Sequence, residues 1–377
     1  MLEKCALCDV LITAENDSKE HVIPNSIGGR KKITGFICDP CNNKSGDDWE
    51  KDLAKQLNPL SLFFRIKRER GDAPAEIFNT TGGEQYRLKS DGSMEATKPC
   101  YNEEVHETGV KININARNMK EARKMLSGVK RKHPSVDLDE LLENAKPESS
   151  YCPDMIQFNL SFGGQKAGRS IIKSALALAV EAGVDPEQCE HAREYLLDED
   201  GEACFGYYYE NDLVVNRPVG IPLHCVYVQG NSTTGLLLAY IEFFGAQRMV
   251  ACLSSTYEGK DFKSLYAIDP VNGSELALDI NLNLNIEDIH ACYRYEKIPN
   301  GSIEEALSSV IPLHMQVHQE QERSRVLSSA VEKAFKGCGA KEGEILTPEH
   351  MKKVTETLMS EITPMMLHQL GLNRKRV

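Results

Sequence analysis

Two Cys-x-x-Cys pairs within the first 41 residues constrain the fold of this chain more than any other feature. The pairs are Cys5/Cys8 and Cys38/Cys41, with 29 residues between them. Two residues between thiolates let both reach one ion from a tight turn, and a second pair completes a tetrahedral shell. The spacing therefore predicts a zinc ion held by four cysteines. Because such a shell leaves no open position, we expect this zinc to be structural and to supply much of the folding energy of so small a segment.

The residues between and after these pairs carry a second pattern. The segment from Glu20 to Gly29 reads EHVIPNSIGG, and Cys41 is followed by NNKSG. An acidic residue directly before a histidine, a proline three residues on, a Gly-Gly turn and an asparagine after the last cysteine resemble HNH endonucleases. The closest match is the branch whose ββα motif is braced by Cys-x-x-Cys pairs. The run from Gly35 to Asn42 also resembles the phage Holliday-junction resolvase of this superfamily. The resemblance covers residues 1–58.

This resemblance implies a metal-dependent nuclease with named roles. His21 would be the general base, since a neutral imidazole can take a proton from water near pH 7. Glu20 and Asn42 would bind the catalytic Mg²⁺ or Mn²⁺, because a hard divalent ion prefers oxygen ligands. Arg30 and Lys44 would hold the substrate phosphate. Neighbouring side chains on a strand point to opposite faces, so Glu20 and His21 can share a site only where the strand bends or ends.

Several alternatives for these residues stay open. Asn43 could replace Asn42 as a ligand, Asp47 or Asp48 could contribute, and Asn42 could merely cap a helix. His21 could be a structural core histidine. The middle asparagine of the HNH pattern is also replaced, because the expected position holds Gly35.

The charge distribution allows nucleic acid as a partner despite the net charge of −12. Residues 1–70 contain 12 Lys and Arg against 11 Asp and Glu, so the acidic excess lies in the remainder of the chain. An acidic protein can grip DNA with a local basic patch, but its affinity should fall steeply with salt. No stretch approaches 18 apolar residues without a charge, and the N-terminus lacks the apolar core of a secretory signal. We therefore expect a cytoplasmic protein that has no membrane partner.

The length of 377 residues predicts more than one domain. We expect an α+β chain: a zinc-braced ββα-metal (HNH) domain over 1–58, a basic connector over 59–100, an α+β domain of unknown role over 101–302, and a helical region over 303–377. The first domain should contain a helix over 47–57, capped by Ser45 and ended by Pro59. Apolar spacing predicts a helix over 165–182, and strands are expected over 204–209, 222–228, 234–243 and 247–254.

The favoured function is a metal-dependent HNH endonuclease that hydrolyses DNA phosphodiester bonds as a nickase or a double-strand cutter. By analogy, a long region after a small HNH unit suggests anti-phage defence, with that region recognising or regulating and with defence-system partner proteins. The apolar C-terminal helices would form a homodimer interface or pack in the chain's own core. The alternative is a non-cutting zinc-knuckle protein that binds nucleic acid or acts as a sensor.

Overall fold

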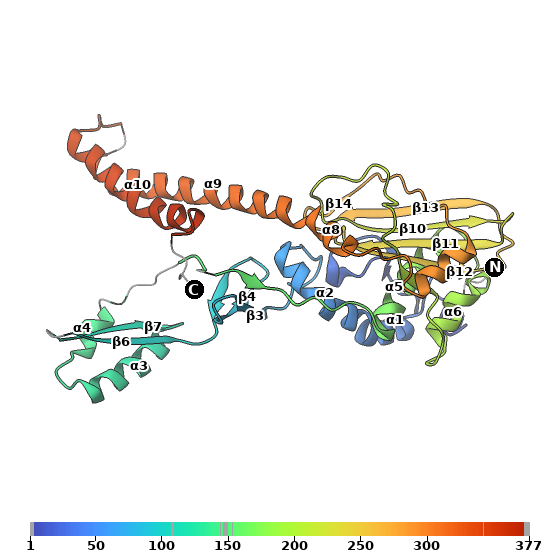
Figure 1. The fold of residues 1–377 in the computed structure, drawn as a ribbon, viewed down its shortest axis with the longest axis horizontal. Helices are drawn as coiled ribbons and strands as arrows, with labels where there is room; N and C mark the ends of the chain where they lie inside the picture. Colours follow the sequence, from blue (N-terminus) through green and yellow to red (C-terminus); the bar gives the residue numbers. More distant parts are fainter. Residues whose placement is uncertain are drawn as a thin grey trace. The chain divides into compact units, whose positions relative to one another are not determined.

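The computed structural model describes residues 4–106, 109–143, 145, 150–152, 154–341 and 343–372 (Figure 1). The chain divides into two compact units. The first unit comprises residues 1–74, 90–92 and 159–316, and the second comprises 75–89, 93–158 and 317–377. The predicted division by role at 58, 100 and 302 stays a prediction, because compactness does not test roles.

The first unit begins with a small ββα arrangement. Its elements in chain order are β1 (Glu20–His21), η1 (Asn25–Ile27), β2 (Lys32–Ile33), α1 (Asp39–Ser45), η2 (Gly46–Glu50) and α2 (Lys51–Phe63). The strands β1 and β2 pair antiparallel, with Glu20 opposite Ile33 and His21 opposite Lys32. We call residues 5–63 the zinc module.

The helix of the zinc module is longer than the sequence pattern indicated. We expected Ser45 to cap it and Pro59 to end it, and both expectations are wrong. Ser45 is the last residue of α1, has helical dihedrals and is 1% exposed, and a π-helical turn, η2, joins α1 to α2. Pro59 lies inside α2, which continues to Phe63 because Leu57, Leu60 and Leu62 are buried on it. Packing of these leucines outweighs the missing hydrogen-bond donor of one proline.

The rest of the first unit is built on a six-stranded antiparallel sheet in the order β14-β13-β10-β11-β12-β9. Its strands are β9 (Phe205–Tyr207), β10 (His224–Asn231), β11 (Leu236–Phe243), β12 (Gln247–Ser254), β13 (Phe262–Asp269) and β14 (Ser274–Glu275). The accompanying helices are α5 (Gln165–Glu181), η3 (Pro186–Gln188), α6 (Glu190–Leu197), α7 (Ile286–Tyr293) and α8 (Ser302–Ser308).

Both faces of this sheet are covered, and the alternation of its side chains shows it. Val226 and Ala239 belong to one apolar cluster, which also contains residues of α5, α6 and the zinc module. Tyr227 and Tyr240, one position further along, belong to another cluster, to which α7 contributes. Helix α5 is buried over the whole of 167–179, since the zinc module and the sheet both pack on it. Figure 1 shows α2 and α5 beneath the sheet.

The second unit contains smaller elements and the C-terminal helices. Its four-stranded sheet has the order β5-β4-β3-β8, formed by β3 (Glu76–Thr80), β4 (Gln85–Leu88), β5 (Met94–Ala96) and β8 (Ile156–Gln157). A separate hairpin and two helices follow, namely β6 (Cys100–His106), β7 (Gly109–Asn115), α3 (Met119–Lys132) and α4 (Leu138–Glu143). Helix α9 (Ile311–Gly337) starts in the first unit and meets α10 (Pro348–Gln369) around Ala334 and Val354.

The structure confirms the predicted fold class. The chain mixes helix and sheet, begins with the small cysteine-braced ββα module and ends in helices. Among the described residues, none of the helices has both the length and the apolar character that crossing a bilayer requires.

Candidate active site

The four predicted zinc ligands lie together. The sulfur atoms of Cys5, Cys8, Cys38 and Cys41 are all within 4.8 Å of one another, and those of Cys8 and Cys38 are 3.6 Å apart. Zinc–sulfur bonds of about 2.3 Å in a tetrahedron place sulfurs about 3.8 Å apart, so the arrangement fits one zinc ion. Cys38 and Cys41 flank the start of α1, and this cluster therefore fixes the helix against the turn that holds Cys5.

Glycines allow the turn between the two strands and the approach to the second cysteine pair. A Cβ on Gly29 would lie 1.8 Å from the carbonyl oxygen of Ile23, so only glycine fits there. Gly35 has a φ of 73°, and its N–H donates to the Asp17 carboxylate at 2.8 Å. The departure from the HNH pattern at Gly35 thus coincides with a left-handed backbone position, which an asparagine adopts less readily than glycine.

His21 lies at the end of β1, and its imidazole is partly exposed, at 20% of the side chain. Its Nε2 is 3.0 Å from Oε2 of Glu69, and the same oxygen lies 2.7 Å from the ammonium of Lys32. The hydrogen bond and ion pair to Lys32, followed by the contact with His21, lower the pKa of Glu69 to about 2. Glu69 is therefore a carboxylate at neutral pH, which is suited to orient an imidazole and to stabilise its protonated form.

Glu20 points into the protein instead and is 3% exposed. Its Oε1 accepts a hydrogen bond from the ammonium of Lys173 on α5 at 2.5 Å. The same ammonium donates to the hydroxyl of Ser45 at 3.1 Å and to the carboxylate of Glu50 on η2. Lys173 is 1% exposed, so three oxygen atoms from three elements surround one buried cation.

The two carboxylates of this cluster titrate in opposite directions. Burial raises the pKa of Glu20 to about 7, and the neighbouring Glu50 adds to this while Lys173 opposes it. Burial alone would also raise the pKa of Glu50, but the charge and hydrogen bond of Lys173 hold it below its ordinary value. One lysine thus faces two carboxylates, of which Glu20 takes up a proton more readily.

The two predicted site residues on β1 have different surroundings. Strand β1 consists of Glu20 and His21 alone, and the Glu20 carboxylate is buried while the His21 imidazole is partly exposed. Asn42 and Ser45 are one turn apart on α1, and the Ser45 hydroxyl donates to the Asn42 carbonyl at 3.0 Å. Ser45 also contacts the ammonium of Lys173, to which Glu20 is bound.

The two predicted phosphate-binding residues have different surroundings. Lys44 is exposed in the last turn of α1. Arg30 is half-buried, and its guanidinium packs against Gly273, where a Cβ would lie 2.0 Å from the guanidinium carbon. Lys32, which the sequence pattern did not single out, is the basic residue that stands opposite His21 in the ladder.

Three polar residues of the site were missed by the sequence analysis: Lys173, Glu50 and Glu69. Lys173 had a local signal, because it is the one charged residue in the otherwise uncharged run 170–179 of a predicted helix. A lysine in such a run is rarely buried without an anionic partner. Glu50 and Glu69 had no comparable signal, since each lies among other charged residues.

The predicted catalytic Mg²⁺ or Mn²⁺ does not fit beside Glu20 in the described arrangement. The oxygen donors of Glu20 are of the right kind for a hard ion, which takes them at about 2.0–2.1 Å for Mg²⁺. However, the carboxylate is buried and already bound to the ammonium of Lys173. The assignment of Glu20 and Asn42 as ligands of this ion therefore stays a prediction.

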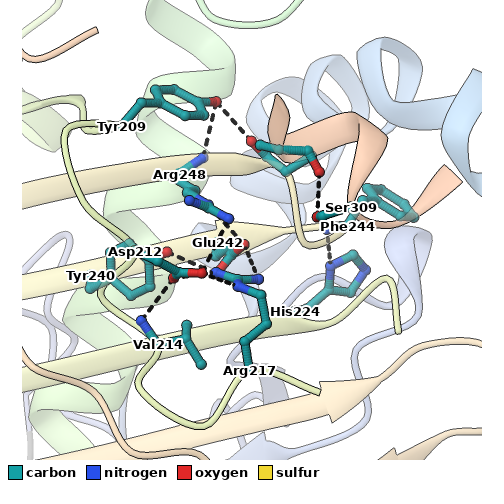
Figure 2. A network of polar contacts seen from close by, with 12 residues as sticks. Tyr209, Asp212, Val214, Arg217, His224, Tyr240, Glu242, Phe244, Arg248 and Ser309 are labelled. Atoms are coloured by element: carbon teal, nitrogen blue, oxygen red, sulfur yellow. Dashed lines mark hydrogen bonds and ion pairs between the residues drawn. The ribbon is translucent and has the colours of Figure 1, made fainter. Parts of the chain in front are cut away.

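A second buried charge network lies on the sheet (Figure 2). The Glu242 carboxylate is fully buried and binds Arg217 at 2.8 and 3.0 Å and Arg248 at 3.4 Å, while the Tyr240 hydroxyl donates to it at 2.8 Å. Asp212 binds both arginines. Two arginines and two carboxylates balance in charge, and their mutual contacts make this a structural network.

Comparison with known proteins agrees with this geometry. A family model described as HNH endonuclease matches residues 5–58. No curated protein and no solved structure matches the chain significantly. The matched range holds the cysteine cluster, the strand with Glu20 and His21, and the helix with Asn42. Residues 5–58 of this chain are therefore an HNH endonuclease domain.

Proposed function

We propose that the chain is an endonuclease that hydrolyses DNA phosphodiester bonds, with His21 as the general base. One observation carries this proposal: a partly exposed imidazole, held by the Glu69 carboxylate, lies at the end of β1 within a domain of the HNH endonuclease family. An imidazole that is held by a carboxylate on one side and reachable by solvent can accept a proton from an attacking water. Lys32, Lys44 and Arg30 supply positive charge in the same module for the substrate phosphate.

The proposed reaction needs charge neutralisation at the phosphate as well as a base. A divalent Mg²⁺ or Mn²⁺ would supply it, and Glu20 and Asn42 could hold that ion only if the contact between Glu20 and Lys173 were broken. This chain's own residues orient the imidazole through Glu69 and fix the helix with Asn42 through the zinc cluster. We further propose a cytoplasmic role in anti-phage defence, in which residues 101–377 recognise or regulate, together with partner proteins or as a homodimer through the C-terminal helices.

The test uses supercoiled plasmid with purified full-length protein and Mg²⁺ or Mn²⁺, beside His21→Ala. We expect conversion to open-circle or linear DNA by the wild type and a loss on the order of 10²–10⁴ in rate for His21→Ala. The product form separates a nickase from a double-strand cutter. Cleavage that survives in His21→Ala would overturn the assigned base.

A non-cutting zinc-knuckle protein that binds nucleic acid is the alternative, and it predicts a different result. Such a protein would shift the plasmid in a gel-shift assay as strongly without Mg²⁺ as with it. Neither the wild type nor His21→Ala would cleave the plasmid. It has no need of an imidazole oriented by a carboxylate, which is why the contact between His21 and Glu69 favours the endonuclease.

A further inference from the structure

The ammonium of Lys173 is held as a metal ion would be held. It contacts oxygen atoms of Glu20, Ser45 and Glu50, which come from β1, α1 and η2. An ammonium has three N–H donors, so each donor has one acceptor here. The cluster thus forms a cradle of oxygens around a cation, in the part of the HNH domain where the resemblance to HNH endonucleases implies a catalytic ion.

The charges of this cradle suit a divalent ion better than a lysine. Glu20 and Glu50 together carry two negative charges when both are ionised, whereas Lys173 carries one positive charge. A divalent ion would neutralise both carboxylates. Lys173 nevertheless has the advantage of being tethered, because a group on the same chain acts at a high effective concentration. Helix α5 is buried over 167–179, which keeps that tether short and rigid.

We propose that Lys173 is an internal competitor for a divalent cation at Glu20. While its ammonium occupies the cradle, the HNH domain does not bind a catalytic ion at Glu20, and an ion enters only when Lys173 leaves. This inference rests on the proposed function for the identity of Glu20 as a metal ligand. The proposal gives Lys173 a role beyond that of a buried ion pair between α5 and the zinc module, because a purely structural ion pair would not control metal binding.

The test measures Mn²⁺ binding to zinc-loaded full-length protein from the electron paramagnetic resonance signal of free Mn²⁺. The substitution is Lys173→Met, which replaces the side chain by an unbranched apolar one that is one atom shorter and removes its charge. We expect the part of the binding that depends on Glu20 to tighten at least tenfold, and to disappear in the double variant Lys173→Met/Glu20→Gln. Because the readout is binding and not cleavage, a chain that fails to cut plasmid can still pass or fail this test.

Two further variants distinguish competition between Lys173 and the metal ion from a purely structural role of the ion pair. Lys166→Met removes a lysine of the same helix that pairs with Asp48 of the same zinc module, and we expect Mn²⁺ binding like that of the wild type. Lys173→Arg keeps a cation and should also bind like the wild type. Unchanged or weakened binding in folded Lys173→Met would overturn the proposal.

A measurement without any lysine substitution covers the case in which Lys173→Met does not fold. Glu20→Gln is made in the wild-type background and titrated in the same way. If Lys173 excludes the ion, the wild type and Glu20→Gln bind Mn²⁺ alike. Weaker binding by Glu20→Gln would show an ion at Glu20 with Lys173 present, and the proposal would be wrong.

Discussion

The Nε2 atom of His224 on β10 lies 2.8 Å from the carbonyl oxygen of Ile27 in the zinc module. Its Nδ1 accepts the backbone N–H of Phe244 at 2.9 Å, as Figure 2 shows. These two partners fix a neutral imidazole that donates from Nε2 and accepts at Nδ1. Complete burial lowers the pKa of His224 to about 4. One histidine thus joins the Gly-Gly turn of the nuclease motif to the central sheet.

We expect the stability of the chain to fall as the pH drops from about 6.5 to about 4. An unfolded histidine, with a pKa near 6.5, binds a proton in this window, whereas buried His224 does not, so acid favours the unfolded state. The loss attributable to His224 is up to about 3 kcal/mol by linkage. Urea unfolding at a series of pH values measures it. In His224→Gln, which keeps a donor and an acceptor but does not titrate, that part of the pH dependence should vanish. An equal slope in both proteins would contradict the prediction.

Removal of zinc should disorder the start of the chain. The four cysteines are the brace of a module with a small core of its own, so a strong chelator or Cys41→Ser should loosen α1 and η2. Trp49, the single tryptophan, lies in η2 and packs against the main core, so its fluorescence reports on this module. We expect a red shift of its emission as zinc is released. Cys100→Ser, at an exposed cysteine outside the cluster, serves as the control.

Substitution of Glu69 should slow catalysis more than it weakens DNA binding. Glu69→Gln keeps a polar contact to His21 but removes the negative charge that stabilises a protonated imidazole. A general base raises the reaction rate by a factor on the order of 10²–10⁴, and we expect this change to lower the cleavage rate by about tenfold. Single-turnover cleavage, with DNA affinity measured separately, checks it. Glu296→Gln, which disrupts an exposed pair with Arg294, should have no effect. Faster cleavage by Glu69→Gln would mean that Glu69 blocks the base instead of orienting it.

Substitution of Lys44 should change DNA binding alone, whereas substitution of Arg30 should also change the stability of the protein. Lys44 is exposed, so Lys44→Met should weaken binding of all DNA sequences alike and reduce the slope of log affinity against log salt by about 0.9. Arg30 packs against Gly273 and is also proposed to hold the phosphate, so Arg30→Met should lower the unfolding midpoint as well as the salt slope. Titrations of one duplex at several salt concentrations, together with melting curves, separate these effects. Equal salt slopes for Lys44→Met and the wild type would remove Lys44 from the DNA-binding surface.

Local patterns predicted much of the fold. Helix α5 and the strands β9 to β12 lie within a few residues of their predicted ranges, because their apolar residues recur with a clear period. Strand β13 was missed, since Phe262–Asp269 mixes polar and apolar residues without strict alternation. The burial of the second face of the sheet was not predicted either, because the sequence of a strand does not show whether other elements pack on one face of its sheet or on both.

The candidate site divides in the same way between local and distant residues. The cysteine cluster could be predicted because its four residues stand in two closely spaced pairs of one motif. The partner of Glu20 could not be predicted, because Lys173 lies 153 residues away and reaches it only through the packing of α5. Pro59 was wrongly expected to end the helix, because the burial of its neighbours outweighed this strong local signal.

The buried position of α5 has a consequence for any attempt to isolate the HNH domain. Its residues 167–179 are covered on one side by the recognisable motif and on the other by the sheet, in one continuous core. Excising residues 1–58 would expose apolar surface on the fragment and on the remainder of the chain, and this would favour aggregation of both. We therefore expect that residues 1–58 do not fold on their own, and that the side chains of α5 restrict which substitutions the buried face of the HNH domain tolerates.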